Sequence, residues 1–224
     1  VLFGSNNLFV FLNPVNTAMA EGSPEVAILA YGEDRRSTEN VWHSDMTWRA
    51  EQPFASLLPA QSLPPSGGDT LRASMYAAYD ALPDKLKAIL PDLHAVHGIS
   101  PEYRREVLES TQGVQALHRV EAAMGPVRHP LVRRHRVTGR PVVFVNRSFT
   151  WHIEGLRAHL SRSLLEMLFD HIAQPEFQVR FRWLEHALAF WDNRSAQQYA
   201  VSDYFPSPRH MHRITLVTDR RAAR

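Results

Sequence analysis

The sequence contains no cysteine among its 224 residues. Disulfide bonds and thiolate metal sites are therefore excluded, and any metal ion must be held by nitrogen and oxygen ligands. Long hydrophobic runs are absent too: none approaches the roughly 20 residues of a membrane-spanning helix. The first residues also lack the basic segment that opens a signal peptide. We therefore expect a cytoplasmic protein with no membrane partner.

Lysine is nearly absent as well. Lys85 and Lys87 are the only two, so arginine supplies almost all of the 25 basic residues. The formal net charge is only +2, although the calculated pI is about 9.2. A high pI alone is weak support for nucleic-acid binding, which requires basic residues gathered on one face. We expect no nucleic-acid partner and keep such binding only as a remote alternative.

The length is sufficient for one domain with a substantial core, so we expect residues 1–224 to form a single domain. The chain begins at Val1 rather than at methionine, which leaves open that it is a fragment. Apolar or alternating segments predict β-strands at residues 8–12, 25–31, 54–60, 141–146, 177–183, 187–191 and 214–217. Helical spacing predicts helices at 74–82, 83–90 and 161–171, and residues 92–127 read as an irregular or partly helical excursion. Many short strands without regular βαβ alternation favour a mainly β fold with some α-helix (α+β), built on two sheets.

A His and an Asp lie two residues apart in the segment Val41-Trp42-His43-Ser44-Asp45. On a strand these two side chains would point to the same face. An imidazole and a carboxylate that converge in this way can supply two of the three ligands of a non-haem Fe(II) oxygenase. The pair alone is a weak signal, because about 0.5 such pairs are expected by chance in a chain of this composition.

Several further motifs follow in a fixed order and make the pattern specific. The motifs are Trp42-His43-Ser44-Asp45, Gly67-Gly68-Asp69-Thr70, His129-Pro130 with Thr138-Gly139-Arg140, Phe144-Val145-Asn146-Arg147, Trp191-Asp192-Asn193-Arg194 and Arg209-His210-Met211-His212-Arg213. Together they resemble the Fe(II)- and 2-oxoglutarate-dependent dioxygenases of the taurine dioxygenase family, from about Phe3 to Asp219. That resemblance implies a double-stranded β-helix (jelly roll) with flanking helices, from which the N-terminal part of the family fold is missing here.

The resemblance assigns roles to individual residues. It implies that His43 and Asp45 are iron ligands. By the same comparison, Thr70 and Arg209 would bind the far carboxylate of 2-oxoglutarate, and the arginine would make a charge-assisted contact. Arg213 would face an anionic substrate group such as a sulfonate, and Phe149 would form part of the substrate pocket.

One position departs from the family pattern. The third iron ligand in this family is a His shortly after Trp-Asp-Asn-Arg, and Gln198 stands there in this sequence. A Gln offers a neutral amide oxygen, a weaker donor to iron than imidazole. For the remaining histidines of family-like segments we expect structural roles; these are His129, His152, His186 and His212.

The resemblance implies oxidation of a small aliphatic substrate, such as a sulfonate or sulfate ester, with release of succinate and CO2. The cofactors would be Fe(II) and the co-substrate 2-oxoglutarate, the other partners O2 and a small anionic molecule, and the assembly a homo-oligomer. The alternative is a non-catalytic or impaired homologue, because the third ligand is Gln198.

Overall fold

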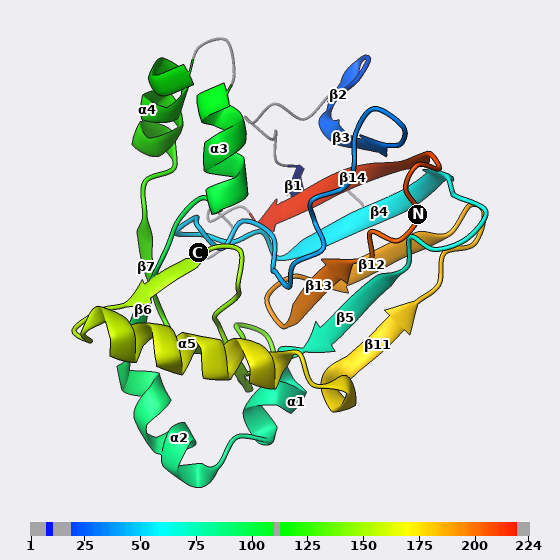
Figure 1. Ribbon diagram of the computed structural model, residues 1–224. Helices are drawn as coiled ribbons and strands as arrows, with labels where there is room; N and C mark the ends of the chain where they lie inside the picture. Colours follow the sequence, from blue (N-terminus) through cyan, green and yellow to red (C-terminus); the bar gives the residue numbers. More distant parts are fainter. Residues whose placement is uncertain (1–7, 11–18, 110–112, 219–224) are drawn as a thin grey trace.

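The computed structural model describes residues 8–10, 19–109 and 113–218 (Figure 1). It combines antiparallel sheets with helices, which confirms the predicted α+β class. The predicted strand at residues 8–12 and the connection that follows it lie partly outside the described residues. Among the described helices, none has the length and apolar character needed to span a bilayer.

The largest sheet has strand β14 near its centre, paired on its two sides with β3 and β4. Its strands are β12 (Leu188–Asp192), β4 (Ala55–Ser62), β14 (Arg209–Thr218), β3 (Ser23–Tyr31) and β2 (Met19–Ala20) in spatial order, and β1 (Leu8–Val10) also pairs with β14. Because side chains alternate along a strand, Arg209, Met211 and Arg213 share one face of β14. Met211 is fully buried and Arg209 is 5% exposed, so this face points into the protein.

A smaller antiparallel sheet consists of β11 (Gln178–Phe181), β5 (Thr70–Ser74) and β13 (Ala196–Ala200). Its register places Thr70 opposite Ala200 and Arg72 opposite Gln198. A cluster of apolar side chains joins this sheet to the larger one. The cluster consists of Leu58, Ala60, Ala189, Trp191 and Met211, with Phe181 and Trp183 packed against it.

The remaining strands and the helices surround these sheets. The strands are β6 (His94–His97), β7 (Val127–Pro130), β8 (Val132–Arg134), β9 (Pro141–Val143) and β10 (Thr150–Ile153). The helices are α1 (Met75–Asp80), α2 (Asp84–Ile89), α3 (Pro101–Glu109), α4 (Gly113–Ala123) and α5 (Ala158–Ile172), with 3-10 turns at Leu90–Asp92 and Pro175–Phe177. Figure 1 shows α3 and α4 standing side by side, apart from α1, α2 and α5.

Helix α5 shows why the predicted helices form where they do. Leu165, Leu168, Phe169 and Ile172 follow helical spacing and are all buried, so one face of the helix packs into the main apolar cluster. The helix predicted at 161–171 is thus confirmed, three residues longer at its start. The excursion predicted at 92–127 is partly helical as expected, but it also contains strand β6.

Candidate functional site

The His43 to Asp45 segment is held against β13 by its backbone. His43 donates its N–H to the Gln198 carbonyl at 3.0 Å, and Gln198 donates to the His43 carbonyl at 2.7 Å. These bonds form an isolated bridge, and the chain turns immediately afterwards, with Met46 at a positive φ of 54°. The assumption of a regular strand here is therefore wrong, because the turn ends the pairing after one residue. The side chains of His43 and Asp45 nevertheless converge, with Nε2 and Oδ1 3.7 Å apart.

Asn193 fixes the turn that carries Asp45. Its side-chain oxygen accepts the Asp45 N–H at 2.8 Å, and its amide group donates to the Asp45 carbonyl at 2.9 Å. Asn193 is only 1% exposed, so these bonds form in a dry environment where they are strong. The Asn of the Trp-Asp-Asn-Arg motif therefore acts on the aspartate 148 residues earlier in the chain.

The Asp45 carboxylate is buried but ionised. Burial opposes its ionisation, but Arg213, His43, the Ser56 hydroxyl and Arg72 outweigh that effect and hold the pKa of Asp45 below its usual value. Ser56 donates to Oδ2 at 2.9 Å, and Nη1 of Arg213 lies 3.5 Å from Oδ1. Oδ1 is therefore an anionic donor atom at neutral pH.

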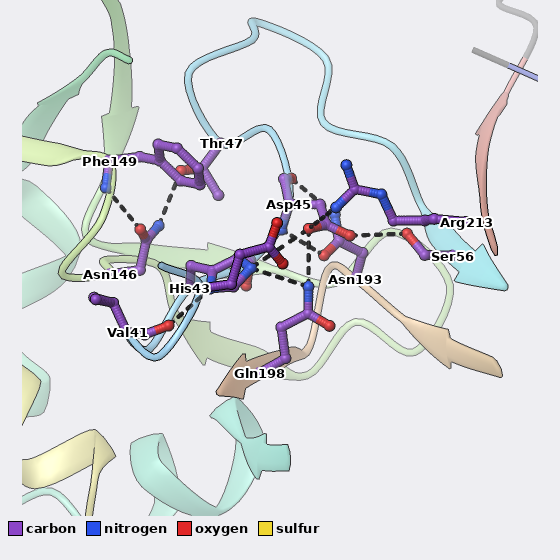
Figure 2. Close-up of polar contacts among 12 residues, drawn as sticks. Val41, His43, Asp45, Thr47, Ser56, Asn146, Phe149, Asn193, Gln198 and Arg213 are labelled. Carbon is purple, nitrogen blue, oxygen red and sulfur yellow. Dashed lines mark hydrogen bonds and ion pairs between the residues drawn. The ribbon is translucent and has the colours of Figure 1, made fainter. Parts of the chain in front are cut away.

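Nδ1 of His43 lies 2.8 Å from the Val41 carbonyl, which can only accept, so Nδ1 carries a proton. In the neutral ring, Nε2 therefore keeps its lone pair and presents it to the same point. The amide nitrogen of Gln198 faces both of these atoms: its Nε2 lies 2.9 Å from Oδ1 of Asp45 and 3.1 Å from Nε2 of His43 (Figure 2). The Gln198 oxygen accepts a hydrogen bond from Nη1 of Arg72. We call His43, Asp45 and Gln198 the His–Asp–Gln end of the site.

The distances between the three polar atoms of this end fit a metal ion, but the Gln198 atom among them is chemically unsuited to bind one. Neighbouring donors around a six-coordinate divalent ion lie about 3 Å apart. The three atoms of this end form a triangle with sides of 2.9, 3.1 and 3.7 Å, close to one face of such a coordination sphere. The Gln198 atom at the third corner is an amide nitrogen, which has no lone pair to offer. Accordingly, no cluster of three His, Asp or Glu suited to a metal occurs in the described part of the chain. The residues fit a metal once the Gln198 amide turns its oxygen inward.

Thr70 and Arg209 form the opposite end, which we call the Thr–Arg end. The Thr70 oxygen accepts the indole N–H of Trp183 at 3.0 Å, which leaves the hydroxyl proton free to bind an anion. Arg209 lies beside the rings of Trp183 and Tyr204. Its Nε is buried and has no hydrogen-bond partner within the described residues. Burial lowers the pKa of Arg209, but a guanidinium starts so high that it stays charged.

One small cavity connects the two ends. Its lining includes His43 and Gln198 of the first end, Thr70 and Arg209 of the second, and Arg213. The buried guanidinium and hydroxyl of the Thr–Arg end suit a carboxylate, whereas the converging lone pairs of His43 and Asp45 suit a cation. The cavity thereby brings together the residues that the sequence assigned to separate roles.

A larger cavity adjoins the first at the His–Asp–Gln end. Phe149 lines it and stands edge-on to the His43 ring, with ring centroids 6.2 Å apart. Arg213 lines both cavities, and its Nε is another buried atom with no hydrogen-bond partner among the residues described. His43 and Asp45 also line the larger cavity, so a molecule bound there would lie next to them.

Sequence reasoning missed the partners of these residues. Arg72 and Trp183 contact Gln198 and Thr70 directly, and neither was singled out. A usable signal for Arg72 was its position two residues after Thr70, which places both on one face of a strand. The histidine expected to be structural in this region, His129, has its Nε2 3.0 Å from the carbonyls of Thr47 and Arg49.

Comparison with known proteins places the chain in a family. Residues 11–215 match the family model described as taurine catabolism dioxygenase TauD, TfdA family. A sulfate ester dioxygenase of Pseudomonas putida that depends on alpha-ketoglutarate is 35% identical over 179 residues, which cover 79% of this chain and 59% of that protein. An alpha-ketoglutarate-dependent 2,4-dichlorophenoxyacetate dioxygenase of Cupriavidus pinatubonensis is 37% identical over 80% of this chain and 60% of its own length. The crystal structure of a taurine dioxygenase from Burkholderia xenovorans superposes with a TM-score of 0.74 at 33% identity, covering 94% of this chain and 68% of that one. The chain thus spans about three fifths of the length of these two sequence relatives.

Proposed function

The chain belongs to the TauD, TfdA family, and from that membership we propose that it is an Fe(II)- and 2-oxoglutarate-dependent dioxygenase. Its substrate would be a small aliphatic sulfonate or sulfate ester, oxidised with release of succinate and CO2. The observation that carries this proposal is the small cavity lined by His43 and Gln198 together with Thr70 and Arg209, with Oδ1 of Asp45 3.7 Å from Nε2 of His43. The two principal sheets would be the jelly roll of the family, with the site between them.

At the His–Asp–Gln end, each side chain would hold the iron in a different way. His43 would bind through Nε2, because its Nδ1 proton is committed to the Val41 carbonyl. Asp45 would bind through Oδ1 and offset part of the ion's charge, while Oδ2 stays on Ser56. Gln198 would bind through its amide oxygen after the amide turns. When bound, iron supplies the activation of O2 that is coupled to decarboxylation of 2-oxoglutarate.

The Thr–Arg end would select a five-carbon dicarboxylate by its far carboxylate. Arg209 would pair with that carboxylate through its guanidinium, and Thr70 would donate its hydroxyl proton. The contact satisfies the buried Nε of Arg209, whose isolation from hydrogen-bond acceptors is otherwise costly. The acid would then extend toward His43, which lines the same cavity.

The larger cavity would take the substrate to be oxidised. Arg213 supplies a cation at its wall and Phe149 an apolar surface, a combination suited to an aliphatic anion. Burial alone would lower the pKa of Arg213, but Asp45, Glu39 and Tyr31 raise it, so the guanidinium is permanently charged. The names of the two sequence relatives, a sulfate ester dioxygenase and a 2,4-dichlorophenoxyacetate dioxygenase, support an anionic substrate.

A second candidate function is favoured by one specific observation. The Gln198 oxygen is engaged by Arg72, and its nitrogen faces His43 and Asp45. A protein that keeps this arrangement would bind 2-oxoglutarate or a similar acid at the Thr–Arg end and hold iron poorly. It would be an impaired or non-catalytic member of the family.

An anaerobic titration with Fe(II) in the presence of 2-oxoglutarate separates the two candidates. The dioxygenase proposal expects a charge-transfer absorption band for the wild-type protein, and succinate once O2 is admitted. The Gln198→His variant should bind iron at least about tenfold more tightly. Mutation of a residue that only hydrogen-bonds to a metal ligand already lowers metal affinity or activity about 10–100-fold, and position 198 is a ligand position. A band in Gln198→His alone would favour the impaired homologue. No band in either folded protein would overturn the assignment of this site to iron.

A further inference from the structure

Arg72 is a charged residue placed directly opposite Gln198. It lies in β5, two residues after Thr70, and the register of β5 and β13 makes Arg72 and Gln198 direct cross-strand partners. Cross-strand partners have side chains close enough to interact. Here the guanidinium donates from Nη1 to the Gln198 oxygen and stacks on Trp191, with Cζ 3.5 Å from the ring centroid.

Three contacts together determine which way the Gln198 amide faces. Its oxygen meets a cationic donor, and its nitrogen meets a carboxylate oxygen and an imidazole lone pair. Turned by half a rotation, the amide would direct its NH2 group at the Arg72 guanidinium and its oxygen at the Asp45 carboxylate. Both new contacts would be repulsive, so the observed orientation is the stable one in the absence of a cation.

A metal ion would favour the turned amide on the side of His43 and Asp45 but not on the side of Arg72. It would replace the amide hydrogens as the partner of His43 and Asp45, and it would attract the Gln198 oxygen. The NH2 group would still be driven against Arg72, which has no acceptor to offer. Arg72 cannot easily withdraw, because its guanidinium is stacked on Trp191, which is itself 8% exposed.

We propose that Arg72 is a positioning residue that holds the Gln198 amide with its nitrogen toward His43 and Asp45 and thereby weakens divalent metal binding at this site. The inference rests on the proposed function, because it takes the His–Asp–Gln end to be the metal site. It adds that the metal affinity of this chain is set by a pair of residues on neighbouring strands, not by Gln198 alone. Burial lowers the pKa of Arg72 to about 10, so the guanidinium remains charged at neutral pH.

The test must separate the hydrogen bond to Gln198 from the positive charge of Arg72, which repels any cation. We would measure Co²⁺ affinity by calorimetry, since Co²⁺ binds nitrogen and oxygen sites more tightly than Fe²⁺. Four proteins form a cycle: wild type, Arg72→Met, Gln198→Ala and the double variant. Arg72→Met keeps an apolar stem against Trp191, and in the Gln198→Ala background it reports the effect of charge alone.

The expected result is a rise in Co²⁺ affinity on Arg72→Met that is at least about tenfold larger when Gln198 is present than in the Gln198→Ala background. Arg72→Lys, which keeps a long cationic donor, should stay close to the wild-type affinity. An equal rise in both backgrounds would overturn the proposal, because Arg72 would then act through its charge only. If Arg72→Met does not fold by circular dichroism, Arg72→Gln takes its place in the same cycle with the same criteria.

Gln198→His distinguishes a failure of this inference from a failure of the proposed function. If Gln198→His binds Co²⁺ but neither the wild type nor Arg72→Met does, the metal site is correct and the role of Arg72 is wrong. If no variant binds Co²⁺, including Gln198→His, the proposed function falls and the inference with it.

Discussion

The two ends of the small cavity differ in how completely their polar atoms are paired. At the His–Asp–Gln end, the amide of Gln198 is bonded through both of its atoms, and both Asp45 oxygens have partners. At the Thr–Arg end, Nε of Arg209 is buried with no partner among the described residues. The first end is closed by its own hydrogen bonds, whereas the second retains a donor for an incoming acid.

This difference indicates which ligand each end favours. An unpaired buried donor costs free energy that a bound carboxylate would recover, so the Thr–Arg end is organised for its ligand in advance. A metal at the other end must first displace the hydrogen bonds of Gln198. We therefore expect binding of the acid to depend on few residues, and binding of the metal to depend on the whole network around Asp45.

The largest effect is expected from Asp45→Asn at the His–Asp–Gln end. It removes the anionic donor and takes from the buried Arg213 its ion-pair partner, so metal binding should be lost and the free energy of unfolding should fall by about 3–5 kcal/mol. Urea denaturation and metal calorimetry measure the two effects. Asp80→Asn is the matched control, because the exposed pair of Asp80 with Arg140 should contribute less than about 1 kcal/mol. Wild-type metal affinity in Asp45→Asn would place the metal site elsewhere.

At the Thr–Arg end, Arg209→Ala should weaken 2-oxoglutarate binding by about 1.5–3 kcal/mol, the range for hydrogen bonds to charged groups. Arg209→Lys should recover only part of this, because an ammonium cannot reproduce the planar guanidinium. Equilibrium dialysis with labelled acid provides the dissociation constants. Arg180→Ala removes a half-exposed arginine paired with Asp69 and should leave the affinity unchanged. Equal affinity of Arg209→Ala and wild type would show that the carboxylate binds elsewhere.

The sequence predicts the apolar parts of this molecule well and the polar strands poorly. The strand predicted at 54–60 is β4, and that at 187–191 is β12. In β12, Ala189 and Trp191 face the core, whereas Leu188 and Phe190 are exposed. The pattern indicates no strand at the positions of β5 or β13. These two strands direct Thr70, Arg72 and Gln198 inward, so they lack the apolar alternation by which strands are recognised.

The candidate site likewise has features that the sequence predicts and features that it does not. Ordered motifs predict His43, Asp45, Thr70, Arg209 and Arg213 as site residues, and in the structure each of them lines one or both of two adjoining cavities. The orientation of the Gln198 amide was not predictable, because it depends on the register between two strands whose residues lie 126 positions apart. The cross-strand pairing of Arg72 with Gln198, together with the contacts of the amide nitrogen with His43 and Asp45, explains why the amide oxygen points away from these two residues.

The buried His97, outside the site, should make the folded protein less stable in acid. This limits the pH range in which ligand binding at the two ends of the site can be compared. Burial, together with His129 and Arg133, lowers the pKa of His97 to about 3, so His97 stays neutral in the folded protein where the unfolded chain would be protonated. Because the unfolded state binds the extra proton, stability should fall by about 1.4 kcal/mol for each pH unit below about 6.5. Urea denaturation from pH 6.5 to 4.5 measures this slope. His97→Gln should reduce this slope by about 1.4 kcal/mol per pH unit, because one proton fewer is taken up on unfolding. An unchanged slope would assign the acid sensitivity to other groups.

The smallest effect concerns Gly68, which lies close to the side chain of Arg209. Gly68 has a φ of +72°, and a Cβ there would lie 3.1 Å from Cδ and 3.2 Å from Nε of Arg209. Gly68→Ala should therefore cost about 1 kcal/mol in backbone strain and also displace the guanidinium, which weakens 2-oxoglutarate binding. Gly139 has nearly the same φ, +69°, and a Cβ there would have no described atom within 4 Å, so Gly139→Ala should lose similar stability but keep the wild-type affinity for the acid. Comparison of the two variants by urea denaturation and dialysis isolates the contact with Arg209. Equal acid affinities in both would mean that the position of Arg209 tolerates this displacement, and that the Thr–Arg end is less rigidly organised than its buried arginine indicates.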